Sequence, residues 1–112
     1  MTRHTPGLYA WMLQRLSAVY LGVFLAYFAI QLLLVSQWTA PVWHAWITHP
    51  VMRFASAGFV LALLAHAWIG MRDIVLDYIK HLGLRLVLFI LIGLVLGSCG
   101  LWALHVLMVA SV

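Results

Sequence analysis

Charged side chains are scarce in this sequence, which has 112 residues but only six Lys or Arg and two Asp or Glu. Charged residues make up 7% of the chain and hydrophobic residues 67%, whereas soluble domains average about 25% and about 45–50%. So few charges could not cover the surface of a water-soluble globule. The composition therefore excludes a soluble domain, gives no reason to expect a nucleic-acid partner, and predicts an integral protein of a lipid membrane.

The sequence also lacks the residues that several kinds of redox site require. Its single cysteine, Cys99, cannot form an internal disulfide or an iron–sulfur ligand array. There is no glycine-rich dinucleotide-binding motif, and no repeat or linker divides the chain. We expect one membrane-anchor domain over residues 1–112, with no catalytic residues that act in this chain alone.

Long stretches without Lys, Arg, Asp or Glu predict where the chain crosses the membrane. A helix needs roughly 20 apolar residues to span the hydrocarbon core, and three stretches supply them. The predicted transmembrane helices cover about residues 13–35, 52–78 and 84–108. The chain is too short and too uniformly apolar for a transmembrane β-barrel. The predicted fold is an all-α membrane protein that forms part of a heteromeric helix bundle.

The distribution of basic residues predicts the orientation, because cytoplasmic connections carry an excess of Lys and Arg. Only Arg53 lies near the connection between the first two predicted helices. The others flank the start of the first helix or the connection between the second and third: Arg3, Arg15, Arg72, Lys80 and Arg85. We therefore expect a cytoplasmic (or mitochondrial matrix) N-terminus and a periplasmic C-terminus.

The first connection is rich in tryptophan, which is typical of the membrane–water interface. It contains Trp38, Trp43 and Trp46, together with Pro41. Because proline is well tolerated at the first position of a helix, a short surface helix is predicted to open near Pro41.

The stretch HAWIGMRDIVLDY, residues 66–78, holds most of the unexplained polar residues. At about 100° per residue, His66, Gly70, Asp73 and Asp77 share one helix face, and Tyr78 lies one step around it. Since a carboxylate facing lipid would cost several kcal/mol, this face is predicted to meet protein or a ligand. At 1.5 Å per residue, His66 lies roughly 17 Å deeper in the membrane than Asp77.

An intramembrane histidine can relay protons, ligate a metal or hydrogen-bond a neighbouring helix. Gly70, one turn from His66, leaves room for a flat group, and a haem held by a neutral imidazole nitrogen fits that description. Spacing alone leaves haem and a simple hydrogen bond open. His105 is predicted to lie about 9 Å too deep to share an iron with His66, so a second ligand would come from another subunit.

Four segments together resemble one family. They are the H-x-W-x-G motif at His66–Gly70, the pair Asp77–Tyr78, the basic Lys80, and the R-x-S segment Arg15–Ser17. They resemble the hydrophobic membrane anchor subunit of succinate dehydrogenase, the smaller cytochrome b556 anchor. The three-helix layout matches over the whole chain, whereas the specific motif spans about residues 66–85.

The resemblance implies a subunit of succinate:quinone oxidoreductase, respiratory complex II, in a bacterial inner membrane (or the mitochondrial inner membrane in a eukaryote). Its partners would be a larger cytochrome b556 anchor subunit, an iron–sulfur subunit and a flavoprotein subunit, in a heterotetramer that can itself trimerise. In that family, electrons from succinate pass through the iron–sulfur subunit to ubiquinone at the membrane.

The resemblance also implies roles for particular residues. His66 would be an axial ligand of haem b, with the larger anchor subunit giving the opposite histidine, and Arg15 would lie near the haem propionates. Tyr78 would donate a hydrogen bond to ubiquinone, and Asp77 would order that site and its proton supply. The simpler interpretations are a positive-inside anchor for Arg15, an interfacial tyrosine for Tyr78 and a local ion pair for Asp77.

Three other functions remain as alternatives. An anchor of a quinol:fumarate reductase has the same requirements. A small proton-coupled transporter would use His66 and Asp77 as its relay, and a purely structural anchor would hold no haem.

Arg72 could reach a propionate or a partner, and Asp73 could simply pair with Arg72.

Overall fold

The computed structural model describes residues 5–109, so that Arg3 and residues 110–112 lie outside the described part. Within it the chain is entirely helical, without strands, as predicted. The helices are α1 (Thr5–Leu34), α2 (Ala40–Thr48), α3 (Pro50–Tyr78) and α4 (Leu82–Val109).

Three of these helices are long and apolar enough to cross a membrane: Gly7–Leu34 of α1, Pro50–Tyr78 and Leu82–Val109. At 1.5 Å per residue each is roughly 42 Å long, which exceeds the hydrocarbon core of about 30 Å. The prediction of three transmembrane helices is therefore confirmed. The helix α1 begins at Thr5, before the expected span, because a helix can continue into the headgroup region.

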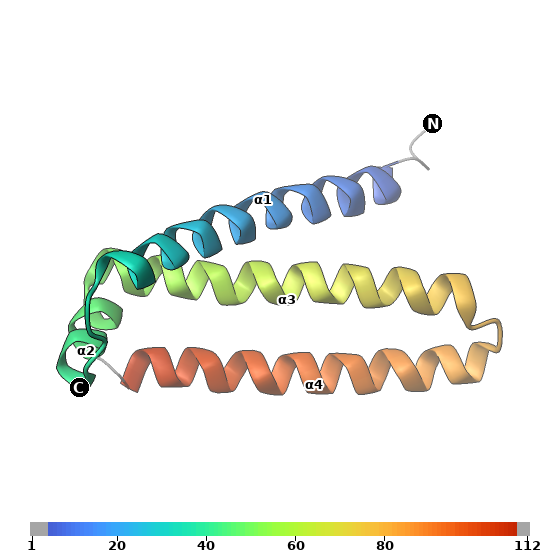
Figure 1. Cartoon of the computed structure of the whole chain (residues 1–112). Coiled ribbons are helices and arrows are strands. Elements are labelled where there is room, and N and C mark those ends of the chain that lie inside the picture. The colour runs from blue at the N-terminus through green and yellow to red at the C-terminus, as the bar shows by residue number, and fades with distance from the viewer. Residues whose placement is uncertain (1–4, 110–112) are drawn as a thin grey trace.

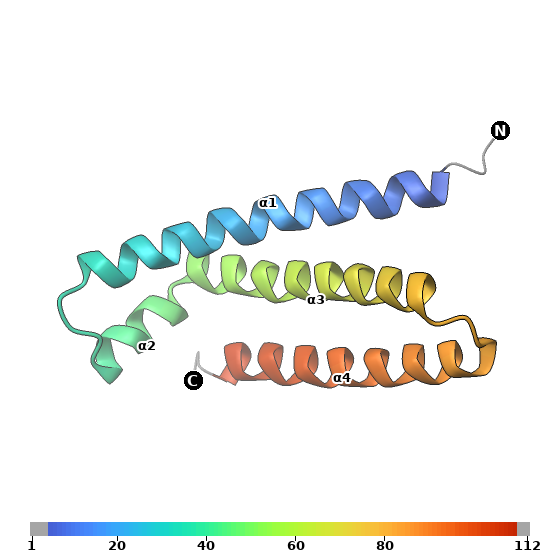
Figure 2. The same ribbon diagram turned by 45° about the vertical axis from the view of Figure 1, so that its right-hand side comes forward.

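The long helices lie in a row with α3 in the middle, and α1 and α4 on opposite sides of it (Figures 1 and 2). The start of α1 and the end of α4 lie at opposite ends of the long axis of the molecule (Figure 1). In both views α1 diverges from α3 towards its N-terminal end. The molecule is elongated, with extents of 51 × 27 × 22 Å.

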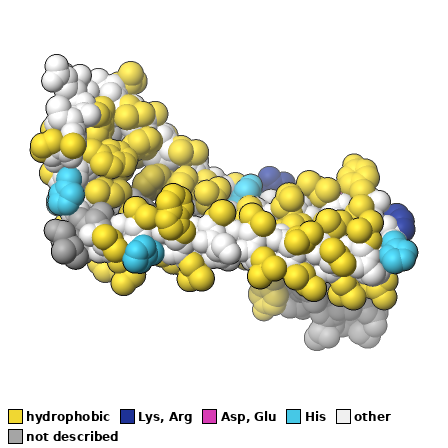
Figure 3. All heavy atoms as spheres, turned by 90° about the horizontal axis from the view of Figure 1, so that it is seen from below, with side chains coloured by type: hydrophobic (Ala, Val, Ile, Leu, Met, Phe, Trp, Pro, Cys, Tyr) yellow, Lys and Arg dark blue, Asp and Glu magenta, His cyan; other side chains and the backbone are white. Residues whose placement is uncertain are grey.

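A single row of helices has little interior. Among the described residues, the buried apolar side chains are Leu21, Ile69 and Val75. Figure 3 shows hydrophobic side chains spread over the surface seen from below the row. Such a surface requires lipid or other subunits to cover it.

Two contacts fix how α3 packs against its neighbours. On the α1 side, the Tyr20 hydroxyl donates to the Ala55 carbonyl at 2.7 Å, and a Cβ at Gly58 would meet that hydroxyl. On the α4 side, a Cβ at Gly100 would collide with Leu64. The glycines let the helices approach closely.

The short helix α2 begins where the proline predicted it. Thr39 is its N-cap, with its hydroxyl accepting from the Val42 N–H, and a proline occupies the first turn. Its indoles form a cluster in which the Trp43 and Trp46 rings lie 5.3 Å apart, and Trp46 lies 5.5 Å from the Phe28 ring of α1. This cluster holds α2 against the end of α1.

Two side chains, one on α4 and one just before it, make hydrogen bonds that stabilise the connection between α3 and α4. The Arg85 guanidinium donates to the carbonyls of Ile79, at 2.6 Å, and Leu76, at 2.9 Å. His81 accepts from the Leu84 N–H at the start of α4. Carbonyls at a helix end have no partner within the helix, so Arg85 stabilises this end of α3.

Candidate functional site

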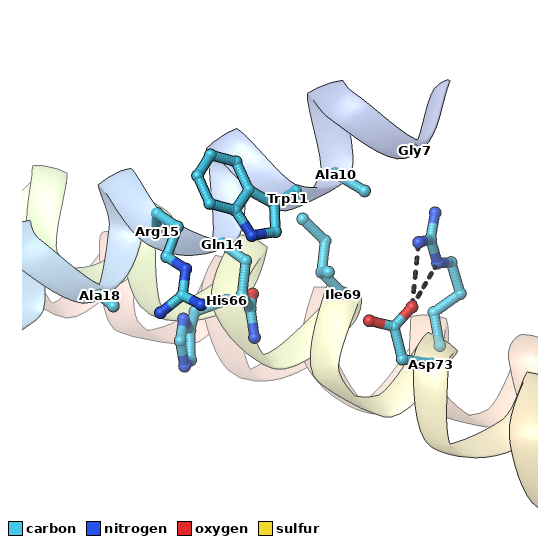
Figure 4. Close-up of a pocket in the computed structure, with 10 residues that line it drawn as sticks. Gly7, Ala10, Trp11, Gln14, Arg15, Ala18, His66, Ile69 and Asp73 are labelled. Carbon is cyan, nitrogen blue, oxygen red and sulfur yellow. Dashed lines mark hydrogen bonds and ion pairs between the residues drawn. The ribbon is translucent and has the colours of Figure 1, made fainter. Parts of the chain in front are cut away.

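A cleft of about 420 Å³ opens between α1 and α3, in the region where the two helices diverge (Figure 4). Its walls combine polar and apolar side chains from both helices. From α1 come Trp11, Gln14 and Arg15, and from α3 come His66, Ile69, Arg72 and Asp73. The predicted polar face of the second transmembrane helix thus turns in part towards α1.

His66 is half-buried, and its Nδ1 lies 3.1 Å from the hydroxyl oxygen of Ser17 on α1. The Ser17 hydroxyl also lies 3.0 Å from the backbone carbonyl of Gln14. A carbonyl can only accept, so the contact with Gln14 uses the single hydroxyl proton of Ser17. With that proton on Gln14, Ser17 accepts from a His66 imidazole that is protonated on Nδ1, and the Nε2 lone pair is then available.

Arg15 brings a positive charge to the same cleft. Its guanidinium carbon lies 5.4 Å from the centre of the Trp11 ring, one helical turn earlier, which is within range of a cation–π contact. Figure 4 shows the Arg15 side chain directed towards the His66 ring. The cleft therefore offers an imidazole and, beside it, the Arg15 cation to an acidic ligand.

Gly70 faces α1. A Cβ at this position would lie 3.7 Å from the Gln14 side-chain nitrogen, which is an ordinary contact distance. The Gln14 amide oxygen is buried and has no hydrogen-bond partner in the described part of the chain. In this structure the Gln14 amide occupies part of the space that Gly70 leaves.

Asp73 pairs with its neighbour Arg72, whose Nη2 and Nε lie 3.0 Å and 3.3 Å from one carboxylate oxygen (dashed lines in Figure 4). This agrees with the local pairing considered for these two residues. Both side chains are substantially exposed, so the pair contributes little to stability.

Asp77 and Tyr78 lie at the last turn of α3, and neither lines the cleft beside His66. Asp77 is exposed and forms no ion pair among the described residues, so the local ion pair that was the simpler interpretation is not seen. Tyr78 is 77% exposed. Both groups are open to a partner or a ligand outside this chain.

The sequence predicted the α3 side of the cleft and only part of its α1 side. The structure adds Gln14 and the contact of Ser17, which the sequence marked only as the last residue of R-x-S. Their hydrogen-bonding side chains in a long apolar segment were the available signal. The exposed side chain of His105 on α4 does not line the cleft, in keeping with the depth argument.

A sequence model of the family described as succinate dehydrogenase/fumarate reductase transmembrane subunit matches residues 1–98. The chain belongs to this family. It is also 34% identical over 100 residues to the succinate dehydrogenase hydrophobic membrane anchor subunit of Coxiella burnetii (strain RSA 493 / Nine Mile phase I), which covers 89% of this chain and 87% of that relative. The resemblance seen in the motifs is confirmed.

As a succinate dehydrogenase/fumarate reductase transmembrane subunit, the chain is part of an oxidoreductase complex and assembles with partner subunits. Its three long helices make it a multi-pass inner-membrane protein. The large exposed apolar surface of α1 and α4 is consistent with such an assembly.

Proposed function

We propose that the chain is an anchor subunit of succinate:quinone oxidoreductase that shares a haem b with a larger anchor subunit and helps to form the ubiquinone-reduction site. The observation that carries this proposal is the placement of His66. In a family member, an imidazole lines an intramembrane cleft with Nδ1 bonded to Ser17 and Nε2 available.

The residues of the cleft fit a haem. The nitrogen of a haem-ligating imidazole that does not bind iron is commonly hydrogen-bonded, and His66 Nδ1 has such a contact with Ser17. Arg15 would neutralise a propionate, and the Trp11 and Ile69 side chains supply apolar walls. Bound haem b would supply a one-electron redox centre, held by His66 and by a histidine of the larger anchor subunit.

The end of α3 would form this chain's part of the quinone site. The exposed Tyr78 hydroxyl can donate a hydrogen bond to a quinone carbonyl, which stabilises the negative charge that develops there during reduction. The neighbouring Asp77 carboxylate can hold a water molecule or pass on a proton. In this proposal the iron–sulfur subunit docks at the same cytoplasmic side and brings electrons from the flavoprotein subunit.

Succinate oxidation and fumarate reduction remain the two directions of such a complex. The family description names both enzymes, whereas the relative from Coxiella burnetii is named for succinate dehydrogenase. That name, together with the Asp77–Tyr78 pair, favours the succinate-oxidising direction.

The haem assignment is tested by reduced-minus-oxidised optical spectra of the purified complex. We expect a b-type α-band in the wild type and its loss or strong reduction in His66→Ala. His105→Ala is the matched control, since its imidazole lies on α4 away from the cleft, and it should keep the band.

The opposite result would support another function. An assembled His66→Ala complex with an undiminished haem band would exclude His66 as a ligand. A haem-free wild type with proton flux that depends on His66 and Asp77 would indicate a transporter. A haem-free wild type without flux but with quinone reduction would indicate a purely structural anchor.

A further inference from the structure

We propose that Ser17 is a positioning residue for the haem ligand: it fixes the His66 imidazole as the Nδ1–H tautomer and holds its ring so that Nε2 can bind iron. This inference rests on the proposed function of His66. It adds a residue on a different helix, α1, to a site otherwise built on α3.

The two contacts of Ser17 favour one proton arrangement over the other. Its oxygen lies 3.0 Å from the Gln14 carbonyl oxygen and 3.1 Å from His66 Nδ1. The Gln14 carbonyl has no proton to give, so the Ser17 hydroxyl donates to it and accepts from the Nδ1–H of His66. If His66 carried its proton on Nε2 instead, the serine would have to abandon the backbone carbonyl.

Burial makes this arrangement persistent. Ser17 is 5% exposed, and Ser56 is the other polar residue buried in the described part of the chain. A hydroxyl removed from water without hydrogen bonds costs about 1–3 kcal/mol by mutational measures, and membrane surroundings offer no replacement partner. Ser17 therefore keeps both bonds, and the bond to His66 joins α1 to the middle of α3.

The consequence for a bound metal follows from the same bond. A ligating imidazole that donates its second N–H to an acceptor is oriented for binding and is a better electron donor to the metal. Better donation stabilises the oxidised iron more than the reduced iron, so it lowers the reduction potential. Loss of the Ser17 oxygen should then raise the midpoint potential and weaken haem binding by roughly 10- to 100-fold.

The experiment compares intact complexes that carry Ser17→Ala, Ser17→Thr or Ser56→Ala with the wild type. Haem affinity is measured by competition with apomyoglobin, and the midpoint potential by redox titration of the α-band. We expect Ser17→Ala to lose haem affinity and shift to a higher potential. Ser17→Thr keeps the hydroxyl, and Ser56→Ala removes a buried serine far along α3, so both should resemble the wild type.

Unchanged affinity and potential in Ser17→Ala would overturn the inference, and so would a Ser17→Thr complex altered as much as Ser17→Ala, because packing alone would then explain the change. If the Ser17→Ala complex does not assemble, haem affinity and midpoint potential are measured on Ser17→Cys instead. It is close to serine in volume but accepts hydrogen bonds weakly, so a wild-type potential there would also overturn the inference. A wild-type complex without haem would instead refute the proposed function.

Discussion

The polar side chains of this chain differ in whether their partners lie within it. Between α1 and α3, Ser17 lies within hydrogen-bond distance of His66, and the Tyr20 hydroxyl donates to a backbone carbonyl of α3. At the end of α3, Asp77 and Tyr78 are exposed. Polar groups in a membrane protein are rarely left without a partner, and those that await one mark functional contacts.

Replacement of Tyr78 by phenylalanine removes one hydroxyl from the end of α3. If that hydroxyl stabilises developing charge on the quinone, quinone reduction should slow by roughly 100-fold. Succinate oxidation with an artificial dye acceptor should stay at the wild-type rate, because the dye bypasses the quinone. The two rates are measured on the same purified complex.

Tyr9→Phe is the control for this variant, since Tyr9 is also an exposed tyrosine, at 66%, in the N-terminal part of α1. It should leave both rates unchanged. An equal loss of both activities in Tyr78→Phe would indicate failed assembly, and two unchanged rates would remove Tyr78 from the quinone site.

Between helices, close approach depends on particular glycines. Gly93 and Gly97 of α4 have the spacing associated with helix pairing, yet a Cβ at Gly97 would meet no atom within 4 Å. The closest approach to α3 is at Gly100, where a Cβ would overlap the end of the Leu64 side chain. The spacing was visible in the sequence, but how closely each glycine approaches α3 was not.

Gly100→Val should therefore separate α3 from α4 in a way that Gly97→Val does not. Both variants introduce the same side chain into the same helix, so their helix propensities are matched. We expect Gly100→Val to lower the free energy of unfolding by about 1–3 kcal/mol more than Gly97→Val. Thermal melts of the complex in detergent measure the difference as a lower Tm.

If Gly97→Val is the more damaging variant, the groove that Gly97 lines between α3 and α4 would be filled by another subunit. Loss of the partner anchor from the Gly97→Val complex on size-exclusion chromatography would identify that case. Equal melts for the two variants would contradict the close contact between Gly100 and Leu64.

For the contacts between helices, the sequence predicted the contacting face of one helix but not that of its neighbour. The face of residues 66–78 could be predicted because its polar residues recur at helical spacing among apolar ones. The apolar residues of the first helix do not gather on one face, so its rotation was not predicted, although the polar side chains of Gln14 and Ser17 were a local signal. The helix itself begins at Thr5, ahead of the predicted span, because hydropathy indicates the membrane core and not the end of a helix.

The whole molecule is a flat arrangement of helices whose composition already predicted a membrane protein. The three long stretches with few charged residues correspond to the helices α1, α3 and α4. Orientation across the membrane is a separate prediction, which rests on the basic residues near the α3–α4 connection and the start of α1.

Orientation can be measured with two matched cysteine variants in a Cys99→Ser background. His44 on α2 and His81 before α4 are both exposed and lie at opposite ends of the long helices. In intact cells, a membrane-impermeant maleimide should label His44→Cys at the periplasmic face and leave His81→Cys unlabelled until the cells are opened. The reverse pattern would invert the predicted topology and place Tyr78 on the periplasmic side.

The scarcity of buried residues decides how this polypeptide tolerates change. With Leu21, Ile69 and Val75 as the apolar residues enclosed by the described part of the fold, a substitution at most other apolar positions alters a contact with lipid or a companion polypeptide. A substitution that weakens a contact with a companion polypeptide would lower the amount of that companion in the membrane, while the altered helices themselves still form. The sequence is therefore constrained less by the folding of this chain than by the lipid and the companion polypeptides that contact it.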